Sequence, residues 1–84
     1  MRARHRRTLE RLFSQPTPAN IRWREVVALM DALDYGISER SGSRVAFQSS
    51  RETLVVHKPH PRPEIDRNAA RVIARFLKDE GITP

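Results

Sequence analysis

The sequence contains no cysteine, and its 84 residues include only 3 glycines and 1 tryptophan. Without cysteine the chain can form neither a disulfide nor a thiolate metal site, and a reducing compartment is permitted. The scattered glycines do not form a phosphate-binding loop. No apolar run approaches the length that spans a membrane, and the basic N-terminus lacks the apolar stretch of a signal peptide. A chain of this length closes one hydrophobic core, which excludes a two-domain enzyme with a separate cofactor-binding half.

Positive charge is abundant, and arginine supplies most of it. Lysine and arginine number 16 against 10 acidic residues, so the formal net charge is +6, and the only lysines are Lys58 and Lys78. A guanidinium donates two parallel hydrogen bonds to one phosphate, so this composition predicts a nucleic acid or an acidic protein as partner. Five of the arginines lie in the first eleven residues. That segment could contact phosphate or be a solvated arm, and taken alone it also suggests a DNA-binding arm.

Apolar residues at helical spacing predict three helices. They are Met1–Gln15, Ile21–Tyr35 and Asp66–Glu80. Pro16 and Pro18 end the first helix, because proline cannot continue the backbone hydrogen bonds, and residues 15–19 are a linker. Gly36 is expected to supply the left-handed residue that ends the second helix. Asp66 is a candidate N-cap of the third helix, and Gly81 ends it.

Three short segments favour β-strands. Ile37–Gly42 runs from a strand into a turn, with Tyr35–Glu39 able to pair, and Ser43–Gln48 alternates apolar and polar residues. Thr53–His57 is rich in β-branched residues and is expected to be the central strand. The element order predicts an α+β fold, with two helices flanking one face of a three-stranded antiparallel sheet. The predicted core consists of Trp23, Val26, Met30, Val45, Phe47, Val56, Ile73 and Phe76.

Two histidines are the most informative candidates for chemistry. His57 ends the last strand, and His60 lies in the extended loop Lys58–Pro63, which three prolines stiffen. Imidazole moves protons near neutral pH and can act as general acid or base at an RNA 2′-hydroxyl. Lys58 and Arg62 could neutralise the scissile phosphate. Two alternatives remain: the pair could bind metal, although it lacks an obvious third ligand, or either histidine could be an ordinary surface residue.

Four segments of the chain resemble the HicA family of toxins from HicBA toxin–antitoxin systems. They read L-D-Y-G-I from Leu33, G-S-R-V-A-F from Gly42, V-H-K-P-H-P-R-P from Val56 and F-L-K-D-E-G-I from Phe76. The resemblance covers residues 23–83. It implies a fold like the double-stranded-RNA-binding domain over residues 19–84, with residues 1–18 as a basic N-terminal helical extension and linker. It also implies a cytoplasmic, ribosome-independent mRNA interferase that needs no cofactor or metal, and a HicB-like antitoxin as protein partner.

One position departs from that family's pattern. The family's motif is Gly-Ser-His with a catalytic histidine, and here Arg44 follows Gly42 and Ser43. Arginine stays protonated and cannot act as a general base. Either the chemistry has moved to His57 and His60, of which His60 matches a second family histidine, or the protein is a non-catalytic RNA- or protein-binding module. We expect His57 and His60 as the catalytic pair. The expected RNA-binding residues are Ser43, Arg44, Lys58 and Arg62.

Overall fold

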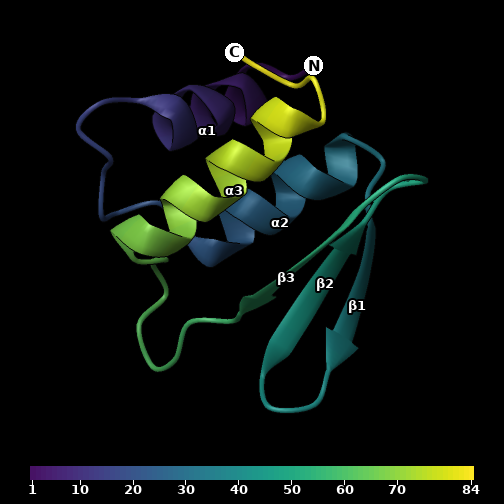
Figure 1. The fold of residues 1–84 in the computed structure, drawn as a ribbon. Coiled ribbons are helices and arrows are strands. Elements are labelled where there is room, and N and C mark those ends of the chain that lie inside the picture. The colour runs from purple at the N-terminus through teal and green to yellow at the C-terminus, as the bar shows by residue number, and fades with distance from the viewer.

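The computed structural model describes all 84 residues and contains three helices and three strands. The elements are, in order, α1 (Ala3–Phe13), α2 (Trp23–Ala32), β1 (Gly36–Arg40), β2 (Arg44–Gln48), β3 (Thr53–His57) and α3 (Arg67–Asp79). The helices lie together on one side of the sheet, and both chain termini are at the α1 end (Figure 1). None of the helices has the length and apolar character that a membrane span requires.

The sheet is antiparallel throughout, with strand order β1-β2-β3. This confirms the predicted α+β architecture. The central strand is β2, however, so the expectation that Thr53–His57 would be central was wrong. In this edge strand Val56 is buried under the helices, while Val55 on the opposite face is 43% exposed. A run of β-branched residues therefore does not distinguish an edge strand from a central strand here.

The sequence features at the helix ends act locally. Asp66 caps α3, accepting a hydrogen bond from the Ala69 N–H at 2.7 Å. Gly81 ends α3 with a φ of +82°, as predicted. The corresponding prediction for α2 was wrong: Asp34 takes the left-handed conformation, with a φ of +67°, and Gly36 is the first residue of β1. The helix stops earlier than expected because its last carbonyls are already satisfied by the N–H groups of Asp34 and Tyr35.

The predicted core is confirmed. Six of its eight residues are buried in one cluster, and Trp23 and Phe76 are partly buried against it. Val72, next to Ile73 in the sequence, is 41% exposed. Its position on α3 points it away from the sheet, whereas Ile73 and Leu77 face the core.

The N-terminal helix shares this core. Leu9 and Leu12 of α1 are each 2% exposed and belong to the same hydrophobic cluster as the strands. Helix α1 packs against both α2 and α3. The following linker is also fixed, because Arg67 at the start of α3 donates a hydrogen bond to the Thr17 carbonyl at 3.0 Å. The segment is therefore packed structure rather than a solvated arm.

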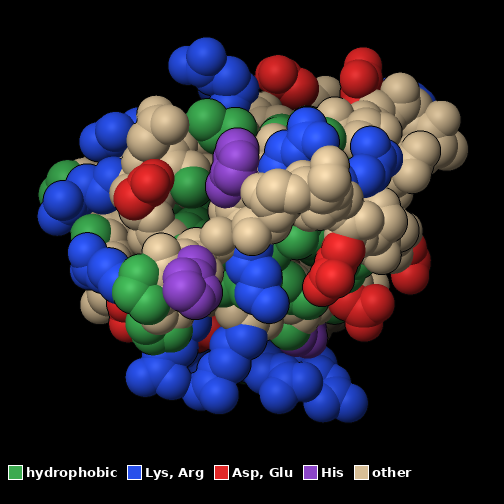
Figure 2. Space-filling view, turned by 90° about the horizontal axis from the view of Figure 1, so that it is seen from below, with side chains coloured by type: hydrophobic (Ala, Val, Ile, Leu, Met, Phe, Trp, Pro, Cys, Tyr) green, Lys and Arg blue, Asp and Glu red, His purple; other side chains and the backbone are tan.

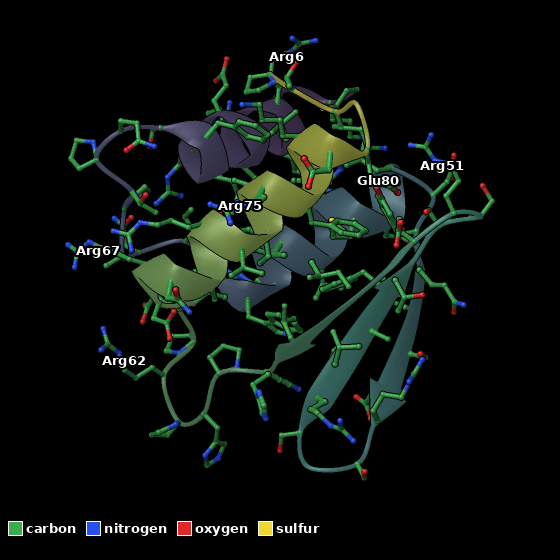
Figure 3. All side chains as sticks on the ribbon, viewed as in Figure 1. Arg6, Arg51, Arg62, Arg67, Arg75 and Glu80 are labelled. Atoms are coloured by element: carbon green, nitrogen blue, oxygen red, sulfur yellow. The ribbon has the colours of Figure 1, made fainter.

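A polar cluster joins the β2–β3 turn to the end of α3. The Tyr35 hydroxyl hydrogen-bonds Glu80 at 2.9 Å, and Arg51 forms an ion pair with the other Glu80 oxygen at 3.2 Å (Figure 3). Burial, helped by the neighbouring Glu80 carboxylate, raises the pKa of Tyr35 to about 12. Hydrogen bonds from Ser49, Tyr35 and Arg51 hold the pKa of Glu80 below its ordinary value. This cluster lies at the opposite end of β3 from His57.

Candidate functional site

Three basic or titratable side chains form a row across the sheet. In the strand register Arg40 faces Arg44, and Arg44 faces His57. Directly opposite residues in antiparallel strands place their side chains on the same face, with Cβ atoms about 5 Å apart. That face is the open one, because the alternate residues Val45 and Val56 are buried under the helices. The register therefore places His57 beside Arg44 on the open face.

The β1–β2 turn positions Arg44. Its guanidinium donates to the Ser41 carbonyl at 2.9 Å and to the Ser41 hydroxyl at 3.3 Å. Gly42 and Ser43 both have positive φ, which reverses the chain within three residues. Neither Arg40 nor Arg44 forms an ion pair with a carboxylate. The turn therefore presents guanidinium groups whose charge no acidic side chain neutralises.

Lys58 joins the hairpin to the proline loop. Its N–H donates to the Ser43 carbonyl at 2.8 Å, which extends the β2–β3 pairing beyond His57. Lys58, Ser43, Arg44 and Arg40 line one surface cleft of about 310 Å³, which Glu39 also enters. Three of the four predicted RNA-binding residues thus meet in a single cleft.

The loop after Lys58 is anchored at its far end. The Trp23 N–H donates to the Pro63 carbonyl at 2.8 Å, and the Ile65 N–H donates to the Ile21 carbonyl at 2.9 Å. His60 and Arg62 line a cleft of about 400 Å³ on the outer side of this loop, together with acidic residues. Arg62 is 77% exposed and lies 4.0 Å from Glu64, pointing away from the loop (Figure 3).

The structure brings some predicted residues together and leaves others apart. His57 faces Arg44, whereas His60 lines a different cleft from Ser43 and Arg44. Both imidazoles are exposed, and no hydrogen bond or ion pair orients either of them. Seen from below, histidine side chains lie exposed among many lysine and arginine side chains (Figure 2). No group of three or more potential metal ligands exists, so His57 and His60 remain without a third ligand.

Sequence reasoning missed Arg40. It lay in the segment Ile37–Gly42, expected to run from a strand into a turn, and was given no role, yet it completes the row with Arg44 and His57. The signal was available in the hairpin: a three-residue turn at Ser41–Ser43 places residues 40 and 44 opposite each other. Arg22 and Arg24, at the start of α2, were also missed, because their closeness to the proline loop is a tertiary contact.

The fold is that of a small α+β domain like the double-stranded-RNA-binding domain, here with an additional N-terminal helix. Residues 23–82, well over half of the chain, match the family model described as HicA toxin of bacterial toxin-antitoxin. The chain therefore belongs to the HicA toxin family and is the toxin of a toxin–antitoxin system, in which HicA toxins pair with HicB antitoxins. Helix α1 lies outside the matched residues. No curated protein and no solved structure matches the chain.

Proposed function

We propose that this toxin is an endoribonuclease that cleaves mRNA in the cytoplasm without the ribosome, using His57 and His60 for proton transfer. The observation that carries the proposal is the row of Arg40, Arg44 and His57 on one open sheet face. Like charges directly opposite each other destabilise a sheet. A bound phosphate would relieve that repulsion, and it would lie beside an imidazole.

The proposed reaction needs only protein groups. The RNA 2′-oxygen attacks the adjacent phosphorus and loses its proton to one imidazole, forming the 2′-oxygen–phosphorus bond. The bond from phosphorus to the 5′-oxygen breaks, and the other imidazole protonates that oxygen. The products are a 2′,3′-cyclic phosphate and a 5′-hydroxyl. Ser43, Arg44, Lys58 and Arg62 bind the RNA, and the cations among them stabilise the extra negative charge of the transition state.

The test is cleavage of a defined RNA by purified protein in the presence of a metal chelator. His57→Ala and His60→Ala should each reduce the cleavage rate by about a hundredfold or more, as expected for removal of a general acid or base. Arg71→Ala, an exposed change on α3, is the control for handling and folding. Full cleavage by the His57→Ala, His60→Ala double variant would refute the assignment.

A non-catalytic binding module is the second candidate function. It is favoured by Arg44 at the position of the family's catalytic histidine, and by the lack of any partner that orients His57 or His60. Arg44→His separates the two. If the wild type binds RNA without cutting it and Arg44→His gains cleavage, this branch has lost its catalyst and acts by binding. If the wild type cleaves and Arg44→His binds RNA more weakly, Arg44 serves as a phosphate contact.

A further inference from the structure

A cleft between the start of α2 and the proline loop combines cations with an aromatic ring. It has a volume of about 450 Å³ and is lined by Trp23, Arg22, Arg24, Lys58, Arg62 and prolines of the loop. No carboxylate lines it. Four other surface clefts each contain at least one carboxylate. This cleft is thus distinguished by its four cations and by a partly buried tryptophan.

Both walls of the cleft are fixed by the fold. The Trp23 ring packs on Phe47 of β2, with ring centroids 5.8 Å apart and an angle of 47° between their planes. On the other wall, the Trp23 N–H holds the Pro63 carbonyl at 2.8 Å, and proline restricts the backbone along the loop. A ligand entering here would meet a largely preorganised surface, which lowers the entropic cost of binding.

The cleft is continuous with the proposed cleavage surface on two sides. Lys58 lines both this cleft and the hairpin cleft that contains Arg44. Arg62 lines both this cleft and the one that contains His60. A polyanion bound between Arg44 and the loop therefore passes the Trp23 cleft.

We propose that this cleft binds a single nucleotide of the RNA strand, with its base against the Trp23 ring and its phosphate among the surrounding cations. The inference rests on the proposed action on RNA and adds a subsite beside the histidines. Aromatic rings and guanidinium groups together are how proteins hold unpaired bases, which stack on the ring while the backbone phosphates meet the cations. An acidic protein segment would use the cations and leave the ring without a matching planar group.

Trp23 is the only tryptophan, so its fluorescence reports on this cleft alone. The experiment titrates the wild type with a short 2′-O-methyl RNA, which binds but cannot be cleaved because its 2′-oxygen is blocked. A second titration uses an abasic strand of the same length, and a third uses poly-glutamate. The proposal expects quenching by the 2′-O-methyl RNA, and weaker binding without quenching by the other two polyanions.

Two pairs of substitutions give a matched comparison. Arg22→Gln with Arg24→Gln removes two cations from the cleft, and Arg71→Gln with Arg75→Gln removes two exposed cations from α3. The first pair should weaken binding of the 2′-O-methyl RNA about tenfold, whereas the second should change it less than twofold. Trp23→Leu, which keeps an apolar contact to Phe47, should weaken it by a further factor of about ten through lost stacking.

The outcomes separate this subsite from the cleavage proposal. Equal quenching by the abasic strand or by poly-glutamate would overturn the nucleotide subsite, because no base would then be needed. So would equal effects of the two arginine pairs. If the histidine variants cleave normally while Trp23 is still quenched as described, the acid–base assignment fails and the subsite stands. If the histidine variants lose cleavage but RNA leaves Trp23 fluorescence unchanged, the subsite fails and the cleavage proposal stands.

Discussion

Asp34 has a left-handed backbone conformation, which is unfavourable for residues that carry a side chain. Its φ is +67°, and the Tyr35 N–H bonds the Met30 carbonyl at 3.0 Å in the hydrogen-bonding pattern that glycine usually completes. The left-handed conformation costs most L-residues about 1–2 kcal/mol, although aspartate tolerates it better than most. At the end of α3, Gly81 occupies the equivalent place.

Asp34→Gly is therefore expected to stabilise the protein. The gain from relieving the left-handed conformation exceeds the added entropy of the unfolded glycine chain, and the net effect should be about 0.5 kcal/mol. Urea unfolding measures it. Asp34→Ala is the control, because it keeps the strain and loses the local tolerance of aspartate, so its stability should fall. A lower unfolding midpoint for Asp34→Gly would contradict this reading.

The shifted pKa values of Tyr35 and Glu80 make stability depend on pH in both directions. The pKa of Glu80 is lowered in the folded state, so its contribution is present above the unfolded carboxyl pKa and is lost as the pH falls through the folded value. The pKa of Tyr35 is raised from 10.0 to about 12, so its contribution is present below about pH 10 and is lost as the pH rises towards 12.

Tyr35→Phe should remove the alkaline loss of stability and reduce the acidic one. It should also destabilise the protein near neutral pH, because the Glu80 carboxylate loses a hydrogen-bond donor. Unfolding free energies measured from about pH 2.5 to about pH 12 test this, because the acidic loss lies below the ordinary carboxyl pKa and the alkaline loss continues towards pH 12. Thr53→Val, at an exposed β3 position, is the control. If Tyr35→Phe loses as much unfolding free energy at alkaline pH as the wild type does, this hydroxyl does not have the proposed role.

At the scale of elements, local sequence predicted most of the architecture. Periodicity identified all three helices and the hairpin strands, and alternation placed Val45, Phe47 and Val56 in the core. Local sequence could not predict the strand order or the end of α2, because tertiary contacts determine both. Strand order depends on which side of the sheet the chain returns to, and the end of α2 depends on Asp34 accepting a conformation that glycine normally takes.

The N-terminal helix shows the same limit. Its narrow apolar stripe predicts a helix but not what covers it. In the structure Leu9 and Leu12 are almost fully buried between α1 and the other helices. The arginines on the exposed face of α1 suggested a solvated arm, but the helix packs into the common core.

Removing part of that stripe should therefore cost substantial stability. Leu12→Ala is expected to destabilise the protein by about 2–4 kcal/mol, from lost burial and the cavity left behind. Arg7→Ala on the exposed face of the same helix is the control and should change stability by less than about 0.5 kcal/mol. Thermal or urea unfolding compares the two. Equal, small effects would mean that α1 is only loosely attached.

At the scale of the whole molecule, the sequence could name candidate site residues, without Arg40, but only part of their geometry. The strand register was accessible from alternation, so His57 beside Arg44 could be anticipated. His60 lies in a separate cleft because the loop continues past it to the start of α2, where backbone hydrogen bonds anchor it. That anchoring joins residues 40 positions apart, which no local pattern encodes.

The net charge of +6 and the unpaired arginines of the hairpin predict how the antitoxin is captured. We expect an acidic HicB-like antitoxin to cover the surface that contains Arg44 and the proline loop. Opposite potentials then steer the encounter, so the association rate should fall as salt increases. Arg40→Glu with Arg44→Glu should lower that rate about tenfold at low salt. Arg71→Glu with Arg75→Glu applies the same charge change on α3 and should have a much smaller effect.

Hydrogen exchange of the complex locates the contact independently of rate. Within the proline loop only Lys58, His60 and Arg62 carry a backbone N–H, and Lys58 is already bonded to the Ser43 carbonyl in the free toxin. New protection should therefore be clearest at His60 and Arg62, whose N–H groups form no backbone hydrogen bond in the free protein. Protection confined to residues 1–15 would instead place the antitoxin on α1. Because the main contacts of α1 are with α2 and α3, that result would leave the proposed RNA surface open in the complex and would require neutralisation by another route.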